Sequence, residues 1–515
     1  MFKESTDRVI SKFVSTTTEW KQYERVLFRF GFIALLVFCI PSDLGWYKHL
    51  FRIDWTNLHA RDLYDIAHIE PHFIDSSRDG RWGIGGYVSW LVVLAIAKVG
   101  TIVWTLLDKK NKEYTKLYYW LTVLVRYRAA LGIIGFSFEK IFPTQMPYPS
   151  LNHLTTNFGD FSGHKIFWTS VGVLSTFQVW GGLVELIPGI LLLFRRTATL
   201  GAALLIGALA TIAIANLGYD GGVHVYASYF VVLGIFLLIK DIPALYNLLI
   251  LEKPTTTLKL EDESKNARAA SWAVKGVFAI YIVVFSYLQF LNFKYDPYKQ
   301  PSTAGVKQLR GLYEVEEFKV NNISIPYSPV DSVRWQDVTF EDWTTLTFRV
   351  HKPLNVDLSN SGGGQSSSGT GHSSVDLEKN YEGAGVAGGR QVFHYYADTV
   401  HHTLYLLNKN LTASKLNTKD QYPKDWISVE AWKIIGDDNH LINPVALSTR
   451  RDRDFAKMDK KLIREKMVLK YTVDQSGNKI ILEGTDENRN PLYVVLRKSE
   501  RTFVAPPCTI VSGTY

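Results

Sequence analysis

Apolar residues are concentrated in the first three hundred positions of this chain, where they form runs long enough to cross a bilayer. A helix needs roughly 20 mostly apolar residues to span the hydrocarbon core. By this measure the sequence predicts seven spanning helices. Their approximate ranges are 26–46, 84–107, 117–142, 166–194, 198–217, 223–246 and 271–293. The fold class predicted for this part of the chain is therefore an α-helical polytopic membrane bundle.

The pattern changes near Lys307, where apolar residues begin to fall on every second or third position. Such alternation is typical of half-buried β-strands. Near the C-terminus, three such runs are separated by short polar turns and predict a meander. These runs are 467–473, 479–484 and 491–497, and further candidate strands lie at 334–340, 344–351, 392–397, 402–408 and 426–435. About eight strands suit a small antiparallel barrel or sandwich.

The two patterns predict a transmembrane helical domain over residues 1–298 and a β domain over 299–515. Within the β domain, residues 359–389 are rich in Ser and Gly and are expected to form a flexible insertion. Residues 383–388, Gly-Ala-Gly-Val-Ala-Gly, match the spelling of a dinucleotide fingerprint. They neither follow a convincing strand nor open a helix in a βαβ unit, so we reject that interpretation.

Basic residues gather in alternate loops between the predicted spans. The N-terminal segment carries Lys3, Arg8, Lys12, Lys21 and Arg25, and three later loops carry Lys109, Lys110, Lys112 and Lys116, then Arg195 and Arg196, then Lys253, Lys259, Lys265 and Arg268. Because Lys and Arg favour the cytoplasmic side, we expect a cytoplasmic N-terminus and, after seven crossings, a β domain on the opposite side of the membrane. No cleavage site follows the first span, which is therefore expected to be an uncleaved anchor. The formal net charge of +8 needs no nucleic-acid partner to explain it.

Charged residues lie about halfway through three of the spans. Lys98, Arg126 and Glu185 are each ten residues from the polar end of a span, or roughly 15 Å into a core of about 30 Å. Gln178 lies within about 20° of Glu185 on its helix. One interpretation is a buried pair of Glu185 with Arg126 or Arg128 that fixes helix register. The other is that surplus positive charge favours an anionic or carbonyl-bearing lipophile, such as a quinone head group.

A second polar group is expected near the outer face of the bundle. Its members are Glu139, Lys140, His153, His164, Lys165, Asp220 and His224. His beside a carboxylate is suited to proton transfer, but interfacial anchoring is the favoured explanation for these residue types, with Lys140 as the exception. No metal site is expected, because His401 and His402 lack ligand spacing and Cys39 and Cys508 are far apart in the sequence. No motif for a redox cofactor occurs, so a redox role would need a carrier from a ligand or another subunit.

Two segments resemble helices of the DoxX-like family. Residues 128–140, Arg-Ala-Ala-Leu-Gly-Ile-Ile-Gly-Phe-Ser-Phe-Glu-Lys, are similar to its first helix, and 181–198 are similar to its Glu-containing, glycine-rich second helix. The resemblance covers about 117–246, a four-helix unit. That family includes the small membrane subunit of thiosulfate:quinone oxidoreductase and, more distantly, the membrane part of vitamin K-dependent carboxylase. With a β domain beginning at 312–318, the chain also looks like Bacteroidota membrane proteins that carry a lipocalin-like C-terminal domain.

The resemblance implies a membrane subunit of an oxidoreductase that binds a quinone or another lipophile. Arg128 would orient an anionic or carbonyl group, Lys140 would handle charge or protons at the outer mouth, and Glu185 would pair with an arginine or relay a proton. The expected cofactor-binding residues are Lys98, Arg126, Gln178 and His224. The alternative is a non-catalytic component of an envelope or secretion complex, in which the bundle is an anchor and the β domain binds a protein partner. Membrane lipids are expected partners in both cases.

Overall fold

The computed structural model describes residues 20–74, 84–108, 110–111, 113–255, 265–295, 300–301, 303–353, 376–410, 421–436, 464–505, 507 and 510. Several residues used above lie outside this part of the chain, namely Lys3, Arg8, Lys12, Lys109, Lys112, Lys259 and Cys508, together with 359–375 of the predicted insertion. The chain forms two compact units. The first combines Met1–Ile141 with Trp180–Leu288, and the second combines Phe142–Val179 with Gln289–Tyr515.

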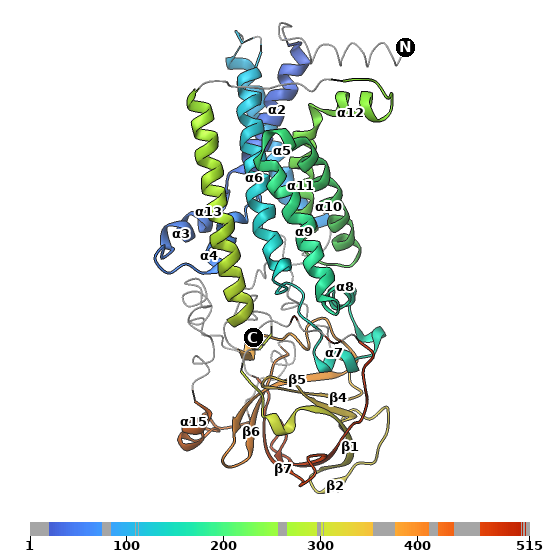
Figure 1. Ribbon diagram of the computed structural model, residues 1–515. Helices are drawn as coiled ribbons and strands as arrows, with labels where there is room; N and C mark the ends of the chain where they lie inside the picture. Colours follow the sequence, from blue (N-terminus) through green and yellow to red (C-terminus); the bar gives the residue numbers. More distant parts are fainter. Residues whose placement is uncertain are drawn as a thin grey trace. The chain divides into compact units, whose positions relative to one another are not determined.

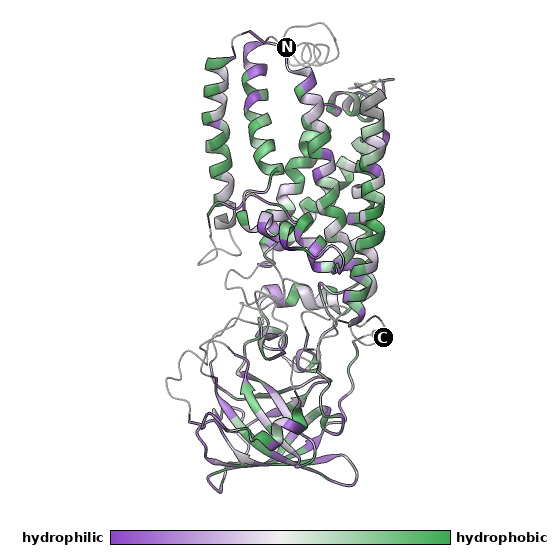
Figure 2. Cartoon of the chain, turned by 90° about the vertical axis from the view of Figure 1, so that its left-hand side faces the viewer, coloured by the Kyte–Doolittle hydropathy of each residue, from purple (hydrophilic) through white to green (hydrophobic). Residues whose placement is uncertain are grey.

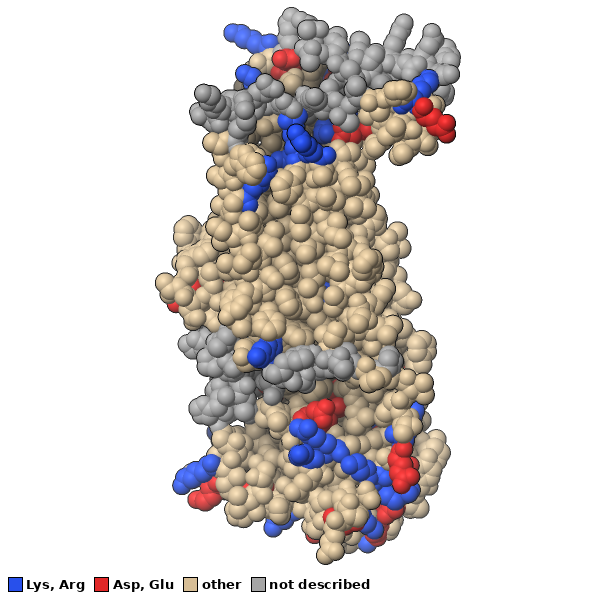
Figure 3. All heavy atoms as spheres, in the orientation of Figure 1, with Lys and Arg blue, Asp and Glu red and all other residues tan. Residues whose placement is uncertain are grey.

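Helices, several of them long and apolar, make up most of the first unit (Figure 1). They are α2 (Gln22–Cys39), α3 (Leu44–Arg52), α4 (Ala60–Ala67), α5 (Val88–Leu107), α6 (Thr115–Ile141), α9 (Ser175–Leu193), α10 (Ala198–Gly218), α11 (His224–Ile239), α12 (Ile242–Leu249) and α13 (Lys265–Tyr295). Figure 2 shows the apolar residues running along these helices. In Figure 3 the charged side chains visible on this unit gather mainly near the end from which α6 starts.

Five helices within the described residues are long and apolar enough to cross a membrane, and up to seven spans result if two bent pairs each count as one. The bent pairs are α2 with α3, at 44°, and α11 with α12, at 75°. The molecule is thus compatible with a multi-pass membrane protein. The predicted span at 166–194 is wrong in its first part, because α8 (Gly163–Gly172) ends before α9 begins and belongs mainly to the second unit's segment 142–179.

The second unit is built on an antiparallel β-barrel. Its strands are β1 (Gly311–Val320), β2 (Ile323–Ser324), β3 (Asp337–Phe340), β4 (Thr345–Arg349), β5 (Arg390–Asp398), β6 (Thr403–Asn408), β7 (Lys466–Val473), β8 (Lys479–Thr485) and β9 (Pro491–Lys498). From β3 onward each strand pairs with the next, and β9 pairs back onto β1. Among the described residues this closes a barrel of eight strands, with β2 attached to β1 as a short hairpin. The prediction of a barrel or sandwich is therefore confirmed as a barrel.

One predicted strand is wrong. Residues 426–435 contain the helix α15 (Val429–Ile435) instead of a strand. The Ser428 hydroxyl accepts a hydrogen bond from the Ala431 amide, and Gly436 ends the helix at a φ of 78°. A serine cap and a glycine in the left-handed region are both signals of helix ends. The sequence contained these signals, but the apolar spacing outweighed them in the prediction.

Large side chains fill the interior of the barrel. Trp335 stacks on Phe348 with ring centroids 4.0 Å apart, and Phe348 stacks on Phe393 at 5.6 Å. The fully buried Tyr313 and Tyr395 belong to the same core. Small barrels of about eight strands have an interior that side chains can occupy completely. This barrel is therefore a packed core.

The described end of the predicted flexible insertion is buried. Glu382 and Ala384 are fully buried. The Ser162 amide donates to the Gly385 carbonyl at 2.9 Å. Gly385 and Gly388 take φ values of 74° and 70°, which glycine adopts at little cost. The glycines of this segment therefore serve a turn that docks on residues 160–162.

Candidate functional site

Glu185 and Lys140 form a buried ion pair between α9 and the last turn of α6. The Lys140 Nζ lies 2.9 Å from the Glu185 Oε2, and the Glu185 side chain is only 1% exposed. Gly182 allows the two helices to approach, because a Cβ there would lie 2.8 Å from the Ser137 carbonyl oxygen. The predicted pairing of Glu185 with an arginine is therefore wrong. Lys140 is twelve residues, about 18 Å, further along α6 than Arg128 and is the cation at the depth of Glu185.

Arg128 is the cation at the centre of α6. It lies thirteen residues from each end of the helix, or about 20 Å. Its Nη2 donates to the Ile69 carbonyl at 2.5 Å, and its guanidinium lies 5.3 Å from the centre of the Tyr229 ring. Tyr226 is a further neighbour. No carboxylate of the described residues forms an ion pair with Arg128, although its side chain is buried. Within the described part of the chain, the partners of Arg128 are therefore neutral.

Aromatic side chains surround the Arg128 guanidinium. The Tyr226 ring stacks on the His68 ring at 4.2 Å and lies 5.5 Å from Phe136. His68 follows α4, and its Nε2 lies 3.7 Å from the Glu70 Oε1. Both members of this pair are partly exposed, at 16% and 29%. Tyr226 thus lies between the buried Arg128 and the partly exposed pair of His68 and Glu70. We call Arg128, Tyr226, Tyr229, Phe136, His68 and Glu70 the Arg128 cluster.

Our reading of the sequence missed His68, Glu70 and Tyr226. His68 and Glu70 lie between the first two predicted spans, where no site residue was predicted. In the structure α4 packs on α6, and Ala67 is 2% exposed, with its Cβ 3.0 Å from where a Cβ on Gly135 would lie. The available signal was the short amphipathic run 60–67 with Asp62 in its first turn. A buried loop helix brings the His–Glu pair to the bundle.

The predicted cofactor-binding residues do not form one cluster. Lys98 is exposed on α5. The Arg126 guanidinium lies 4.9 Å from the centre of the Tyr127 ring. Because Arg126 is two residues from Arg128 in the sequence, the two side chains lie on different faces of α6. His224 starts α11 with its ring 5.6 Å from that of Tyr87. Gln178 belongs to the second unit. There its side chain bonds both the amide and the carbonyl of Met146, at 2.8 and 3.1 Å.

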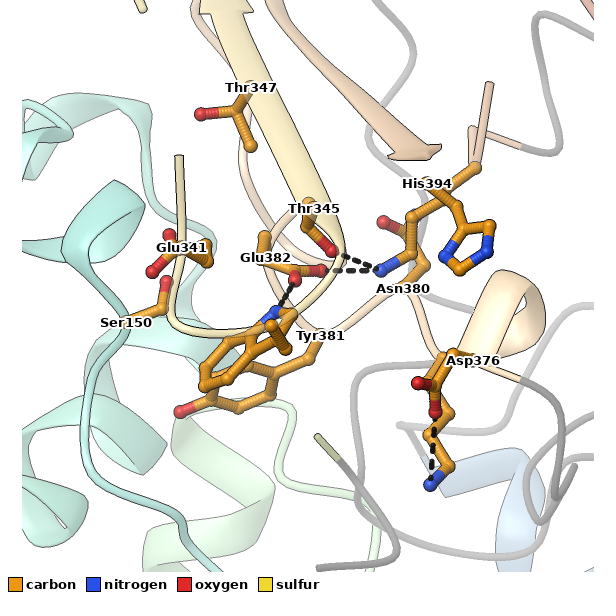
Figure 4. A network of polar contacts seen from close by, with 12 residues as sticks. Ser150, Glu341, Thr345, Thr347, Asp376, Asn380, Tyr381, Glu382 and His394 are labelled. Atoms are coloured by element: carbon orange, nitrogen blue, oxygen red, sulfur yellow. Dashed lines mark hydrogen bonds and ion pairs between the residues drawn. The ribbon is translucent and has the colours of Figure 1, made fainter. Parts of the chain in front are cut away.

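A second polar network lies wholly within the barrel unit (Figure 4). Glu382 and Lys409 are fully buried and form an ion pair, with Nζ and Oε2 2.9 Å apart. Lys409 also donates to the Thr345 hydroxyl at 3.2 Å, and the Trp343 indole N–H donates to Glu382. Figure 4 shows Glu341 on one side of Glu382 and Asn380 on the other. Both charges of the pair are thus satisfied inside the protein.

Glu341 holds the short helix α7 (Leu151–Thr155) against the barrel. Its carboxylate accepts from the amides of Leu151, at 3.0 Å, and Asn152, at 2.7 Å. The Asn152 side chain donates to the Glu382 carbonyl at 3.0 Å and accepts from Thr347 at 3.1 Å. These bonds join residues 142–179 to the strands. We call Glu341, Glu382, Lys409, Asn152 and Lys165 the clasp network.

Lys165 completes the clasp network. Its Nζ donates to the Tyr381 carbonyl at 2.7 Å and lies 4.6 Å from the centre of the Tyr381 ring. Burial lowers the pKa of Lys165 to about 7, against the opposing effect of Glu382. His153 and His164, predicted beside Lys140 at the outer face, lie in this unit and are buried. Every member of the clasp network is bonded within the barrel unit, which indicates a role in closing the structure.

The stability of the barrel unit should depend on pH because of Glu341. Burial, reinforced by the charge of Glu382, raises the pKa of Glu341 from 4.5 to about 7. Between these values the folded unit retains a proton that the unfolded chain releases, so stability falls as pH rises. Glu341→Gln mimics the protonated form. As the pH rises from 4.5 to 8, the free energy of unfolding of this variant should increase by about 3 kcal/mol relative to that of wild type.

Hydrogen exchange of the β3 and β4 peptides in the full-length protein, measured across this pH range, checks the prediction. Glu483→Gln, on a strand of the same barrel, is the matched control and should follow wild type. Parallel pH profiles for Glu341→Gln and wild type would contradict the assignment.

Among the described residues, no three His, Cys, Asp or Glu side chains come together as metal ligands. Comparison with protein-family models, with curated proteins and with solved structures found no match for this chain. The DoxX-like and lipocalin-like resemblances thus stay predictions from the sequence.

Proposed function

We propose that the helical unit binds the head group of a lipophilic molecule with carbonyl or anionic oxygens, with a quinone as the first candidate. In this proposal the protein is a membrane subunit of an oxidoreductase, in a bacterial inner membrane, with the barrel on the periplasmic side. The observation that carries the proposal is the Arg128 guanidinium, which lies at the centre of a spanning helix without a carboxylate partner among the described residues. A buried charge is costly unless it is compensated, and an intramembrane cation is a site candidate by default.

Arg29 shows what a compensated buried arginine looks like in the same unit. Its guanidinium donates to the Tyr114 hydroxyl, at 2.9 and 2.6 Å, to Thr105 at 2.8 Å, and to the Asp108 carbonyl at 2.9 Å. Tyr114 in turn donates to the Asp108 carboxylate. Arg128 has one backbone carbonyl and two tyrosines instead. The contrast supports a ligand oxygen as the remaining partner of Arg128.

The rest of the Arg128 cluster suits a flat head group. Tyr226, Tyr229 and Phe136 supply aromatic faces, which pack well against a planar ring. The partly exposed His68 and Glu70 lie 3.7 Å apart beside these rings. A bound quinone would supply the redox chemistry, with electrons from another subunit. The chain itself would bind and orient the head group.

A second candidate function is a non-catalytic component of an envelope or secretion complex. The filled interior of the barrel favours it, because a packed barrel can act only through its outer surface and loops. In that case the helical unit would be an anchor, and Arg128 would only hold residues 68–70 against α6.

Mass spectrometry of co-extracted lipophiles separates the two candidates. The protein would be purified from native membranes in mild detergent, and the lipophiles counted per protein. We expect a near-stoichiometric quinone or related molecule in wild type. Arg128→Gln should retain at least about tenfold less, because a hydrogen bond to a charged group contributes roughly 1.5–3 kcal/mol. Arg29→Gln, a buried arginine outside the cluster, should keep the wild-type content.

Two results would overturn the oxidoreductase proposal. One is a lipophile content that does not differ between wild type and Arg128→Gln. The other is the absence of any specific lipophile together with envelope proteins in fixed ratio, which would support the anchoring role.

A further inference from the structure

We infer that α3 lies at the boundary of the membrane, with one face in the phospholipid head-group layer. The inference starts from a stripe of exposed apolar residues that crosses the break between α2 and α3. Ile40, Leu44, Tyr47 and Phe51 are 46%, 74%, 36% and 84% exposed. Their spacing of four, three and four residues places Leu44, Tyr47 and Phe51 on one face of the helix. We call these four residues the α3 stripe.

The opposite face of α3 is fixed to the protein, which sets the orientation of the stripe. The Trp46 indole N–H donates to the Ile66 carbonyl at 3.2 Å. The His49 Nε2–H donates to the Asp62 carbonyl, also at 3.2 Å. Both acceptors belong to α4, so α4 holds α3 from one side. The stripe therefore faces away from the unit, at the flank of the bundle (Figure 1).

Helix lengths place α3 at the surface of the bilayer. The 18 residues of α2 rise about 27 Å, which is nearly the thickness of a hydrocarbon core of about 30 Å. The chain then bends by 44° before α3 begins. Lys48 and Arg52 are exposed on α3, and charged residues are costly in the bilayer centre but favourable at its boundary. These features favour a position of α3 at the boundary.

The chemistry of the exposed face matches a phospholipid layer. Tyr47 and the neighbouring Trp55, which is 56% exposed, are the aromatic types that collect at membrane interfaces. Lys48 lies within about 40° of Leu44 and can extend its ammonium group to lipid phosphates while its stem covers apolar surface. The stripe begins at Ile40, the residue that directly follows α2. Continuity with a spanning helix identifies lipid as the occupant of this face.

Spin labels test the position of the α3 stripe. Cysteine would be introduced at Leu44, Phe51 or the exposed polar Asn57 in a Cys39→Ala, Cys508→Ala background of the full chain. The labelled proteins would be reconstituted in phosphatidylethanolamine–phosphatidylglycerol vesicles. We expect collision with dissolved oxygen to exceed collision with a water-soluble nickel chelate at positions 44 and 51 by severalfold. The ratio should reverse at position 57.

Two outcomes would overturn the inference. Nickel accessibility at position 51 equal to that at position 57 would place the stripe in water. Shielding of positions 44 and 51 from both reagents would show that protein covers the stripe. Hydroxyl-radical footprinting of the wild-type protein in the same vesicles needs no substitution. It should leave Phe51 protected and oxidise Tyr327, which is 67% exposed in the barrel unit.

Discussion

Lys140→Met should destabilise the helical unit by about 3–5 kcal/mol, because it leaves the buried Glu185 carboxylate without its cation. The neighbouring charge of Glu139 adds to the cost. The double variant Lys140→Met, Glu185→Leu should recover most of the loss, since an apolar pair of similar volume is often as stable as a buried ion pair. Unfolding by sodium dodecyl sulfate in mixed micelles, followed by far-UV circular dichroism, measures both effects.

Lys98→Met is the matched control for this experiment. It also replaces a lysine of a spanning helix, but Lys98 is exposed on α5. Its replacement should leave the free energy of unfolding unchanged or raise it. Equal destabilisation by the single and the double variant of the Lys140–Glu185 pair would show that packing, and not charge pairing, determines the effect.

Lys409→Met should cost the barrel unit a similar 3–5 kcal/mol, because it leaves the fully buried Glu382 with the Trp343 indole as its hydrogen-bond donor. Lys409→Met combined with Glu382→Gln should recover part of this loss. The glutamine removes the charge while its carbonyl can still accept from Trp343. Hydrogen exchange of the β4 and β6 peptides in the full-length protein reports the stability of this unit.

The exposed pair of Arg497 with Glu314 supplies the control on the same barrel. Its atoms are only 2.6 Å apart, closer than those of Lys409 and Glu382, but the two side chains are 58% and 59% exposed. Exposed ion pairs contribute about 0–1 kcal/mol, so Arg497→Gln should change exchange little. If both variants had equal effects, burial would not be what gives the clasp network its strength.

The sequence predicted the two kinds of structure because each has its own period. Runs near 20 apolar residues indicated the spans, and alternation such as that at 467–473 indicated strands, of which β7 is one. Local signals were less decisive. Val429–Ile435 has apolar spacing that fits a strand, but its serine cap and terminal glycine produced a helix. In the span predicted at 166–194, hydropathy concealed a break between α8 and α9.

The candidate sites were harder to predict because their members come from distant parts of the chain. Helix periodicity identifies Arg128 and Glu185 as intramembrane charges, but it does not measure where one helix lies along another. Lys140 reaches Glu185 because α9 packs on the last turn of α6, and glycines set that close approach. The clasp network joins Asn152 to Glu382 across 230 positions. No local pattern encodes such a contact.

The barrel unit is discontinuous in the chain, and this has a consequence for how the protein is made. Its segment 142–179 leaves the ribosome before four further membrane helices, whereas β9, which closes the barrel against β1, comes last. Asn152 is therefore synthesised long before its hydrogen-bond partners Glu341 and Glu382. The barrel unit can be completed only after the last strand has been made. A fragment cut at the boundary of the apolar region would lack the Leu151 and Asn152 amides that bond the buried Glu341 of its own barrel.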